Sequence, residues 1–142
     1  MRKLTVVPRI GDKSFQIIED IVGSKFSDNF KAIMKGYAGL NVFENIYRDR
    51  DNNIWALGSF DNFTSIYELT KEFIQNYKRK LIPFAYDPGG WHFCLCMDEG
   101  VDYGKIIINR WTDHLPKEQF LIIADSFEEF INGLKREDEI GK

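Results

Sequence analysis

LIPFAYDPGGWHFCLCMD, the sequence of residues 81–98, holds two apolar runs separated by a turn rich in proline and glycine. The first run, residues 81–86, contains Pro83, which has no N–H for a sheet ladder, so we expect either an edge strand or a β-bulge there. The turn Asp87-Pro88-Gly89-Gly90 has proline second and glycine third, the order that a type II turn needs. The stretch therefore predicts two strands joined by a tight turn.

The second run alternates between two kinds of side chain, as expected of a strand whose successive residues point to opposite faces. The large apolar side chains share one face, and the polar and thiol side chains share the other: Trp91, Phe93, Leu95 and Met97 against His92, Cys94, Cys96 and Asp98. Histidine and cysteine are metal ligands. However, alternate residues of one strand lie about 6–7 Å apart, whereas a tetrahedral zinc ion holds its ligands at about 2.0–2.3 Å. We therefore predict no metal site and expect Cys94 and Cys96 to be small buried side chains beneath a helix.

The rest of the chain shows helical and strand patterns in separate groups. Two of the predicted helices begin with the spacing of a capping box, Ser65 with Glu68 and Ser126 with Glu129. Strands come in adjacent runs joined by short turns, so the class is α+β: a largely antiparallel mixed sheet with helices packed around it. The predicted helices cover residues 12–23, 27–39, 65–77 and 126–134, and the further strands cover residues 42–47, 54–60, 105–111 and 120–124.

The composition is that of a globular protein. The chain has 142 residues, 44% of them hydrophobic and 29% charged, which excludes the disordered and fibrous classes. This length suits one domain, and we expect residues 1–142 to form a single one. The net charge of −3 argues against a nucleic-acid-binding protein. Residues 41–142 hold 18 acidic and 12 basic side chains, which is compatible with a basic partner and equally with an ordinary solvated surface.

The sequence has neither a segment typical of a membrane span nor one typical of a signal peptide. No segment reaches the roughly 18 apolar residues of a membrane span, and the apolar run within residues 1–8 is too short for a signal peptide. Cys94 and Cys96 lie two residues apart and do not form a disulfide framework. These features predict a cytoplasmic location and no contact with a membrane.

Motifs that carry catalysis are missing from the sequence. There is no glycine-rich phosphate loop, no G-x-S-x-G elbow and no H-E-x-x-H helix. Asp113-His114 sets a carboxylate beside an imidazole, but catalytic pairs are normally distant in sequence, so we interpret it as a polar loop. Asp98, Glu99 and Asp102 lack the ligand spacing of an EF-hand. We predict no catalytic residues, no cofactor and no enzymatic activity.

Three segments carry a resemblance to a known family: Ile82-Pro83-Phe84-Ala85-Tyr86-Asp87-Pro88-Gly89-Gly90, then Phe93-Cys94-Leu95, then Ala124-Asp125-Ser126-Phe127-Glu128-Glu129-Phe130. With these motifs, residues 12–135 resemble the SUKH superfamily, the Smi/Knr-type group of bacterial immunity proteins and fungal cell-wall regulators. Trp91 departs from the family, which usually has a small or polar residue after the double glycine. Residues 37–39 are a degenerate form of its glycine-rich helix end. The motif residues of this chain are Pro83, Phe84, Gly89, Gly90, Phe93, Ser126, Phe127 and Phe130.

The resemblance implies an α+β fold, no catalysis and an immunity protein that binds and neutralises a cognate toxin domain of nuclease or deaminase type. A scaffold or regulator of cell-wall assembly is the alternative, and a metal-binding enzyme using His92, Cys94 and Cys96 is the third. Aromatic side chains dominate interface hot spots, and acidic ones speed encounter with a basic enzyme. The expected partner contacts are Tyr86, Asp87, Trp91, Asp98, Glu99 and Asp102. Monomer and homodimer both stay open.

Overall fold

The first two helices begin and end at the residues that cap them. The computed structural model describes residue 3, residues 10–110 and residues 116–139. Helix α1, Asp12–Val22, ends at Gly23, whose φ of 79° is the left-handed conformation that glycine adopts without strain. Helix α2, Asp28–Tyr37, follows Ser27, whose Oγ accepts a hydrogen bond from the Phe30 N–H at 3.1 Å. Both predicted helices are confirmed, whereas the predictions for Trp111, Asp113 and His114 lie outside the described residues.

Two later helices differ in how well their capping was predicted. Helix α3, Phe63–Tyr77, begins after Asn62, whose Oδ1 accepts from the Ser65 N–H at 2.9 Å. The predicted capping box at Ser65 is therefore wrong, because Asn62, an equally good capping residue, caps the helix three residues earlier. Helix α5, Phe127–Asn132, begins after Ser126 as predicted, and its Oγ accepts from the Glu129 N–H at 3.0 Å. A short helix α4, Pro116–Gln119, precedes the last long strand.

The hairpin predicted at residues 81–98 lies at the centre of a five-stranded sheet. Its register shifts between Pro83, which pairs with Cys94, and Ala85, which pairs with Phe93, so the proline stands at a β-bulge whose extra residue is Phe84; a bulge was one of the two expected arrangements. In the turn, the Gly90 N–H donates to the Asp87 carbonyl at 3.0 Å, and Gly90 rather than Gly89 has a positive φ, 95°. The predicted type II turn is therefore wrong, because that type needs the positive φ at Gly89. The strands run in the order β3 (Ser59–Phe60), β4 (Leu81–Tyr86), β5 (His92–Cys96), β6 (Ile106–Asn109) and β7 (Phe120–Ala124), with every pair antiparallel.

A second, three-stranded antiparallel sheet stands beside the first. Its strands run in the order β2 (Ile54–Ala56), β1 (Glu44–Arg48) and β8 (Lys135–Arg136), and a 3₁₀ helix, η2 (Glu137–Glu139), follows β8. The single strand predicted over residues 54–60 is thus wrong, since β2 and β3 belong to different sheets. The chain crosses at Gly58, whose N–H donates to the Tyr86 carbonyl at 2.7 Å. The α+β class is confirmed, with two sheets where one was expected.

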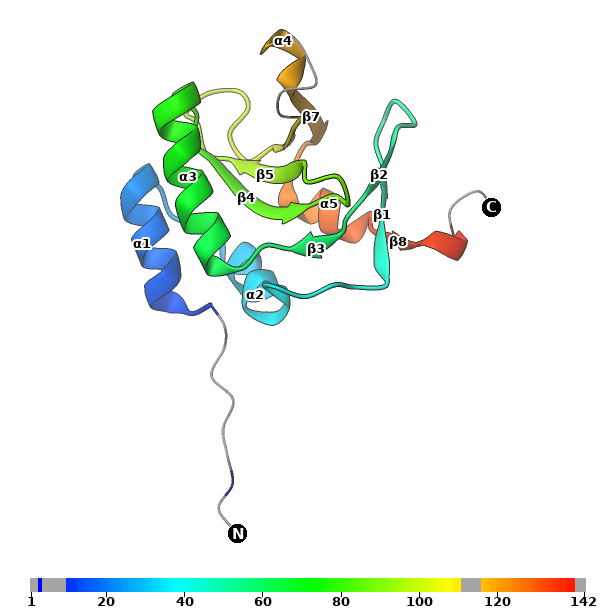
Figure 1. The fold of residues 1–142 in the computed structure, drawn as a ribbon, viewed down its shortest axis with the longest axis horizontal. Coiled ribbons are helices and arrows are strands. Elements are labelled where there is room, and N and C mark those ends of the chain that lie inside the picture. Colours follow the sequence, from blue (N-terminus) through cyan, green and yellow to red (C-terminus); the bar gives the residue numbers. More distant parts are fainter. Residues whose placement is uncertain (1–2, 4–9, 111–115, 140–142) are drawn as a thin grey trace.

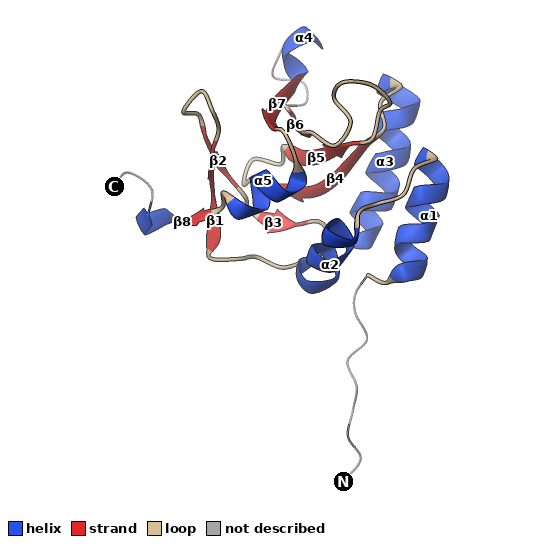
Figure 2. Ribbon diagram, turned by 180° about the vertical axis from the view of Figure 1, so that it is seen from behind, coloured by secondary structure: helices blue, strands red, loops and turns tan. Residues whose placement is uncertain are grey.

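Helices cover both faces of the five-stranded sheet, with α3 on one face and α2 and α5 on the other (Figures 1 and 2). On the α3 face, Phe73 packs with Cys94, Cys96 and Ile107. The opposite face carries the main core, where the Phe84 ring lies 5.2 Å from that of Phe127. Within the described residues, no helix is both long and apolar enough to cross a membrane.

Candidate functional site

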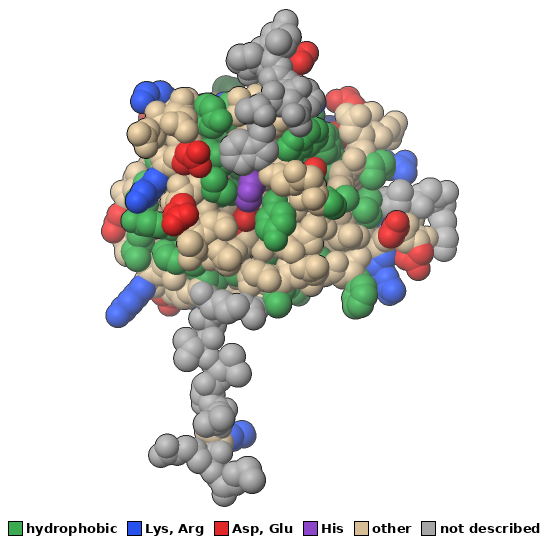
Figure 3. Space-filling model, viewed as in Figure 1, with side chains coloured by type: hydrophobic (Ala, Val, Ile, Leu, Met, Phe, Trp, Pro, Cys, Tyr) green, Lys and Arg blue, Asp and Glu red, His purple; other side chains and the backbone are tan. Residues whose placement is uncertain are grey.

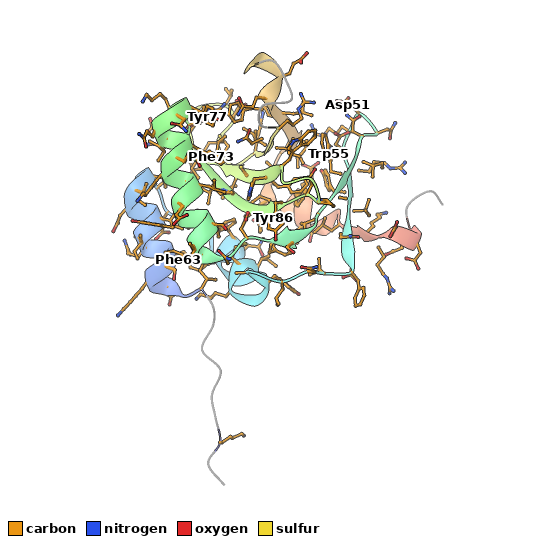
Figure 4. All side chains as sticks on the ribbon, in the orientation of Figure 1. Asp51, Trp55, Phe63, Phe73, Tyr77 and Tyr86 are labelled. Carbon is orange, nitrogen blue, oxygen red and sulfur yellow. The ribbon has the colours of Figure 1, made fainter. Side chains whose placement is uncertain are left out.

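The β4–β5 turn holds three of the predicted contact residues. The Asp87 carboxylate accepts a hydrogen bond from the Trp91 N–H at 2.8 Å, and the Asp87 N–H donates to the Trp91 carbonyl at 2.8 Å. Asp87 therefore fixes the turn with its own side chain, and Trp91 is half-buried. Tyr86, labelled at the end of β4 in Figure 4, is 36% exposed and is the aromatic side chain that the turn offers most openly.

The other three predicted contacts lie at the opposite end of β5. Asp98 pairs with Arg79, its Oδ2 standing 2.5 Å from Nε, and accepts from the Lys80 N–H at 2.7 Å. Asp102 lies 3.6 Å from the Lys105 ammonium, while Glu99 is exposed. The structure thus separates the six predicted residues into two groups, one at each end of a five-residue strand.

Electrostatics show that Asp98 is mainly a structural carboxylate. Burial works to raise the pKa of Asp98, but the hydrogen bonds from Lys80 and Arg79 and the guanidinium charge outweigh it, so its pKa lies below the ordinary value of 3.8. A carboxylate with two internal partners has less to offer a binding partner than the exposed Glu99 beside it.

A buried aspartate that the sequence did not single out stands next to His92. Asp61 has no exposed side-chain surface, and its Oδ2 lies 3.0 Å from His92 Nδ1. Burial raises the pKa of Asp61, and the hydrogen bond and charge of His92 oppose the rise. Histidine is visible at the surface in the view of Figure 3. The centroid of the His92 ring lies 5.6 Å from the centroid of the Tyr86 ring. Local sequence carries no sign of this pair, because 31 residues separate its members.

In many enzymes a carboxylate that orients an imidazole stands beside a catalytic nucleophile. The neighbouring thiols of Cys94 and Cys96 are therefore the candidates for such a nucleophile. Cys94 and Cys96 are fully buried beneath Phe73 of α3, as the sequence predicted. Burial raises the pKa of the Cys94 thiol well above its ordinary value, and the charge of Asp61 adds to the rise. Because the thiolate is the reactive form, Cys94 is a poor nucleophile. Among the residues that the structure describes, no three His, Cys, Asp or Glu side chains converge as a metal site would require.

The motif residues form a packed aromatic cluster rather than an open site. The Phe84 ring is 5.2 Å from Phe127 and 5.6 Å from Phe130, and the Phe93 ring is 5.3 Å from Phe130. These contacts fasten α5 to β4 and β5. Ser126 caps the same helix, while Pro83 directly precedes the β-bulge of β4. The motif therefore maintains the fold that presents the turn at Gly89 and Gly90.

Comparison with known proteins places this fold and its motif cluster in a family. The SUKH_6 family model, described as SMI1-KNR4 cell-wall, matches residues 12–131, and the chain belongs to that family. A similar protein is the SPbeta prophage-derived uncharacterized protein YokK of Bacillus subtilis (strain 168), which is 25% identical over 141 residues, covering 82% of this chain and 70% of the relative. No solved structure matches. The predicted family is confirmed.

Proposed function

We propose that this protein is a non-enzymatic immunity protein, which binds a bacterial toxin domain of nuclease or deaminase type in the cytoplasm and blocks its active site. Membership of the SUKH family carries the proposal. The acidic excess of residues 41–142 would attract a basic, nucleic-acid-cleaving partner.

The two groups of predicted contacts fit within one interface. A five-residue strand spans about 16 Å, and a standard interface covers about 800 Å² on each partner. Tyr86 and Trp91 would supply aromatic contacts at one end of β5, and Glu99 and Asp102 would supply charge at the other. Asp87 and Asp98 would then act by shaping these two ends.

The decisive experiment uses the polypeptide encoded directly upstream of the gene for this chain. Co-expression of the two proteins should restore growth that the upstream polypeptide alone prevents, and the purified proteins should form a stable complex. A double variant, Glu99→Lys with Asp102→Lys, should slow association about tenfold or more at low salt. Glu72→Lys, an exposed reversal on α3, is the matched control. Absence of both binding and protection would contradict the proposal.

A second candidate follows from the family description, which refers to the cell wall. A scaffold or regulator of wall assembly would bind a host protein rather than a toxin. In that case, deleting the gene would change wall composition in cells that carry no neighbouring toxin gene. Protection from the upstream polypeptide, with no wall phenotype, would favour the immunity function.

A further inference from the structure

An apolar surface lies where α2, α5 and the segment leading into β1 meet, away from the residues discussed above. We call it the Phe43 face. Two shallow cavities open there: one of about 190 Å³ between α2, α5 and β1, and one of about 460 Å³ between Phe43 and η2. Val42 lines both, so the two cavities adjoin. The face consists of Ile33, Tyr37, Val42, Phe43, Ile131 and Leu134.

Phe43 is the most unusual member of this face. It is 83% exposed, and its ring contact within the described chain is the Arg136 guanidinium, 5.9 Å from the ring centroid. Tyr37, 43% exposed, lines the smaller, adjoining cavity from α2. Large apolar side chains exposed together are uncommon on monomeric proteins and mark interaction sites. The fold does not need the Phe43 ring for packing, so the ring is free to enter a partner.

The rim of the Phe43 face is acidic. Glu44 borders the smaller cavity, and Glu137 borders the larger one. Neither makes an ion pair with any residue in the described part of the chain. Asp138 is 3.9 Å from Arg136, the basic side chain that lines the larger cavity. Figure 3 shows hydrophobic, acidic and basic side chains together at the lower right, in the region of β1 and β8. Unpaired carboxylates around an apolar surface favour a partner with the opposite charge.

We propose that the Phe43 face is a contact surface for the toxin domain, and that this partner presents lysine or arginine around an apolar recess. Phe43 enters the recess, and one large apolar side chain of the partner fills the cavity beside Val42. Basic groups of the partner pair with Glu44 and Glu137. This inference rests on the proposed immunity function and assigns a surface to it.

The geometry connects this face with the β4–β5 turn. Ser59 of β3 pairs with Tyr86, and the next residue, Phe60, stacks on Tyr37 with ring centroids 5.7 Å apart. Strand β3 therefore contacts Tyr86 through Ser59 and the Phe43 face through Phe60, which also lines the smaller cavity. A partner of ordinary size can reach both.

A second copy of this chain fits the Phe43 face poorly. In a two-fold symmetric dimer the same patch meets itself, so the three carboxylates of this rim, Glu44, Glu137 and Asp138, would face a patch with the same acidic excess. Arg136 is the one basic side chain among the described residues that line the two cavities. Like charges brought together in an interface oppose association. The charge pattern therefore points to a different protein of basic character.

The test measures the affinity of the full chain for a catalytically inactive form of the upstream toxin domain, by calorimetry. Phe43→Ser should weaken binding about 30-fold or more, the loss typical of a hot-spot residue, while leaving the thermal unfolding of the free protein unchanged. Glu44→Lys with Glu137→Lys should weaken it about tenfold and reduce its salt dependence. Ile17→Ser, which removes a 44% exposed apolar side chain from α1, outside both proposed contact surfaces, is the control and should bind normally.

Three outcomes would overturn the inference. If the unaltered protein binds and protects while Phe43→Ser binds equally well, the surface is wrong although the immunity function stands. If the unaltered protein neither binds nor protects, the immunity function fails, and this inference fails with it. If sedimentation shows a dimer that Phe43→Ser converts to a monomer, the occupant of the face is a second copy.

Discussion

At the scale of single residues, several carboxylates of this acidic protein hold its own turns. The Asp49 Oδ1 accepts from the N–H groups of Asp51 and Asn53, each at 2.9 Å, and its Oδ2 accepts from Trp55 Nε1 at 2.9 Å. Asp87 does the same for its own turn, and Asp98 ties the end of the β5 segment to Arg79 and Lys80, just before β4. The charge count of the sequence therefore overstates the acidic surface available to a partner, and Glu44, Glu99 and similar exposed residues matter more.

The role of Asp98 gives a prediction about pH. Asp98→Asn should lower the free energy of unfolding at pH 7 by about 1–2 kcal/mol. The substitution removes the negative charge of the carboxylate that accepts hydrogen bonds from the Arg79 side chain and the Lys80 N–H. The pKa of Asp98 is lowered in the folded state, so its contribution is present above the ordinary value of 3.8 and is lost as the pH falls through the folded-state pKa. The difference between the two proteins should therefore shrink toward about pH 3.

Urea unfolding at both pH values measures this effect. Glu99→Gln, at the exposed neighbouring position, is the control and should change stability by less than about 0.5 kcal/mol. A gap between Asp98→Asn and the unaltered protein that stays constant or widens in acid would show that the carboxylate charge is not what stabilises this loop.

At the scale of elements, the crossing between the two sheets depends on a close backbone approach. Leu57 donates to the Asn45 carbonyl on the side of the smaller sheet, and Gly58 donates to Tyr86 on the side of the larger one. A Cβ at Gly58 would lie 3.1 Å from the Tyr86 carbonyl oxygen and 3.3 Å from the Pro88 nitrogen. These are backbone atoms, so a side chain at this position would press on the turn and force it to move by a few tenths of an ångström.

Gly58→Ala should therefore destabilise the protein by about 1–3 kcal/mol through overpacking. Gly36→Ala is a matched control, because a Cβ there meets nothing within 4 Å and the position is helical. That variant should raise stability, by up to about 1 kcal/mol. Chemical denaturation of both variants gives the comparison, and equal stabilities would mean that the crossing tolerates a side chain.

At the scale of the whole molecule, one aromatic cluster joins helices from both ends of the chain to the sheet. The Phe84 ring of β4 lies 6.3 Å from Phe30 of α2 and 5.2 Å from Phe127 of α5. These edge-to-face contacts are a favoured aromatic geometry. Because Phe84 is fully buried, its loss would leave a cavity between both helices and the sheet.

Phe84→Ala should lower the free energy of unfolding by about 3–5 kcal/mol, a large part of the roughly 5–15 kcal/mol that stabilises a typical domain. Phe43→Ala makes the same chemical change at an 83% exposed position and should cost less than about 0.5 kcal/mol. Thermal and urea unfolding followed by circular dichroism measure both. Comparable losses in the two variants would contradict the assignment of Phe43 to the surface.

The sequence by itself determined the family, the α+β class and most of the elements, because local spacing and capping act over a few residues. Ser27 and Ser126 mark the true starts of their helices, and the alternation along β5 predicted which side chains α3 covers. Where two local signals competed, as between Asn62 and Ser65, the sequence pattern could not decide which residue caps the helix.

Only the tertiary structure decided the division into two sheets, the pairing of Asp61 with His92 and the exposure of Phe43. Each depends on contacts between residues far apart in the chain, and periodicity carries no information about those contacts. Apolar Val42 and Phe43 predicted the start of a strand, yet the strand begins at Glu44, and the fold leaves Phe43 in solvent. Whether an apolar side chain is buried depends on which elements pack over it, and that is settled only when the whole chain has folded.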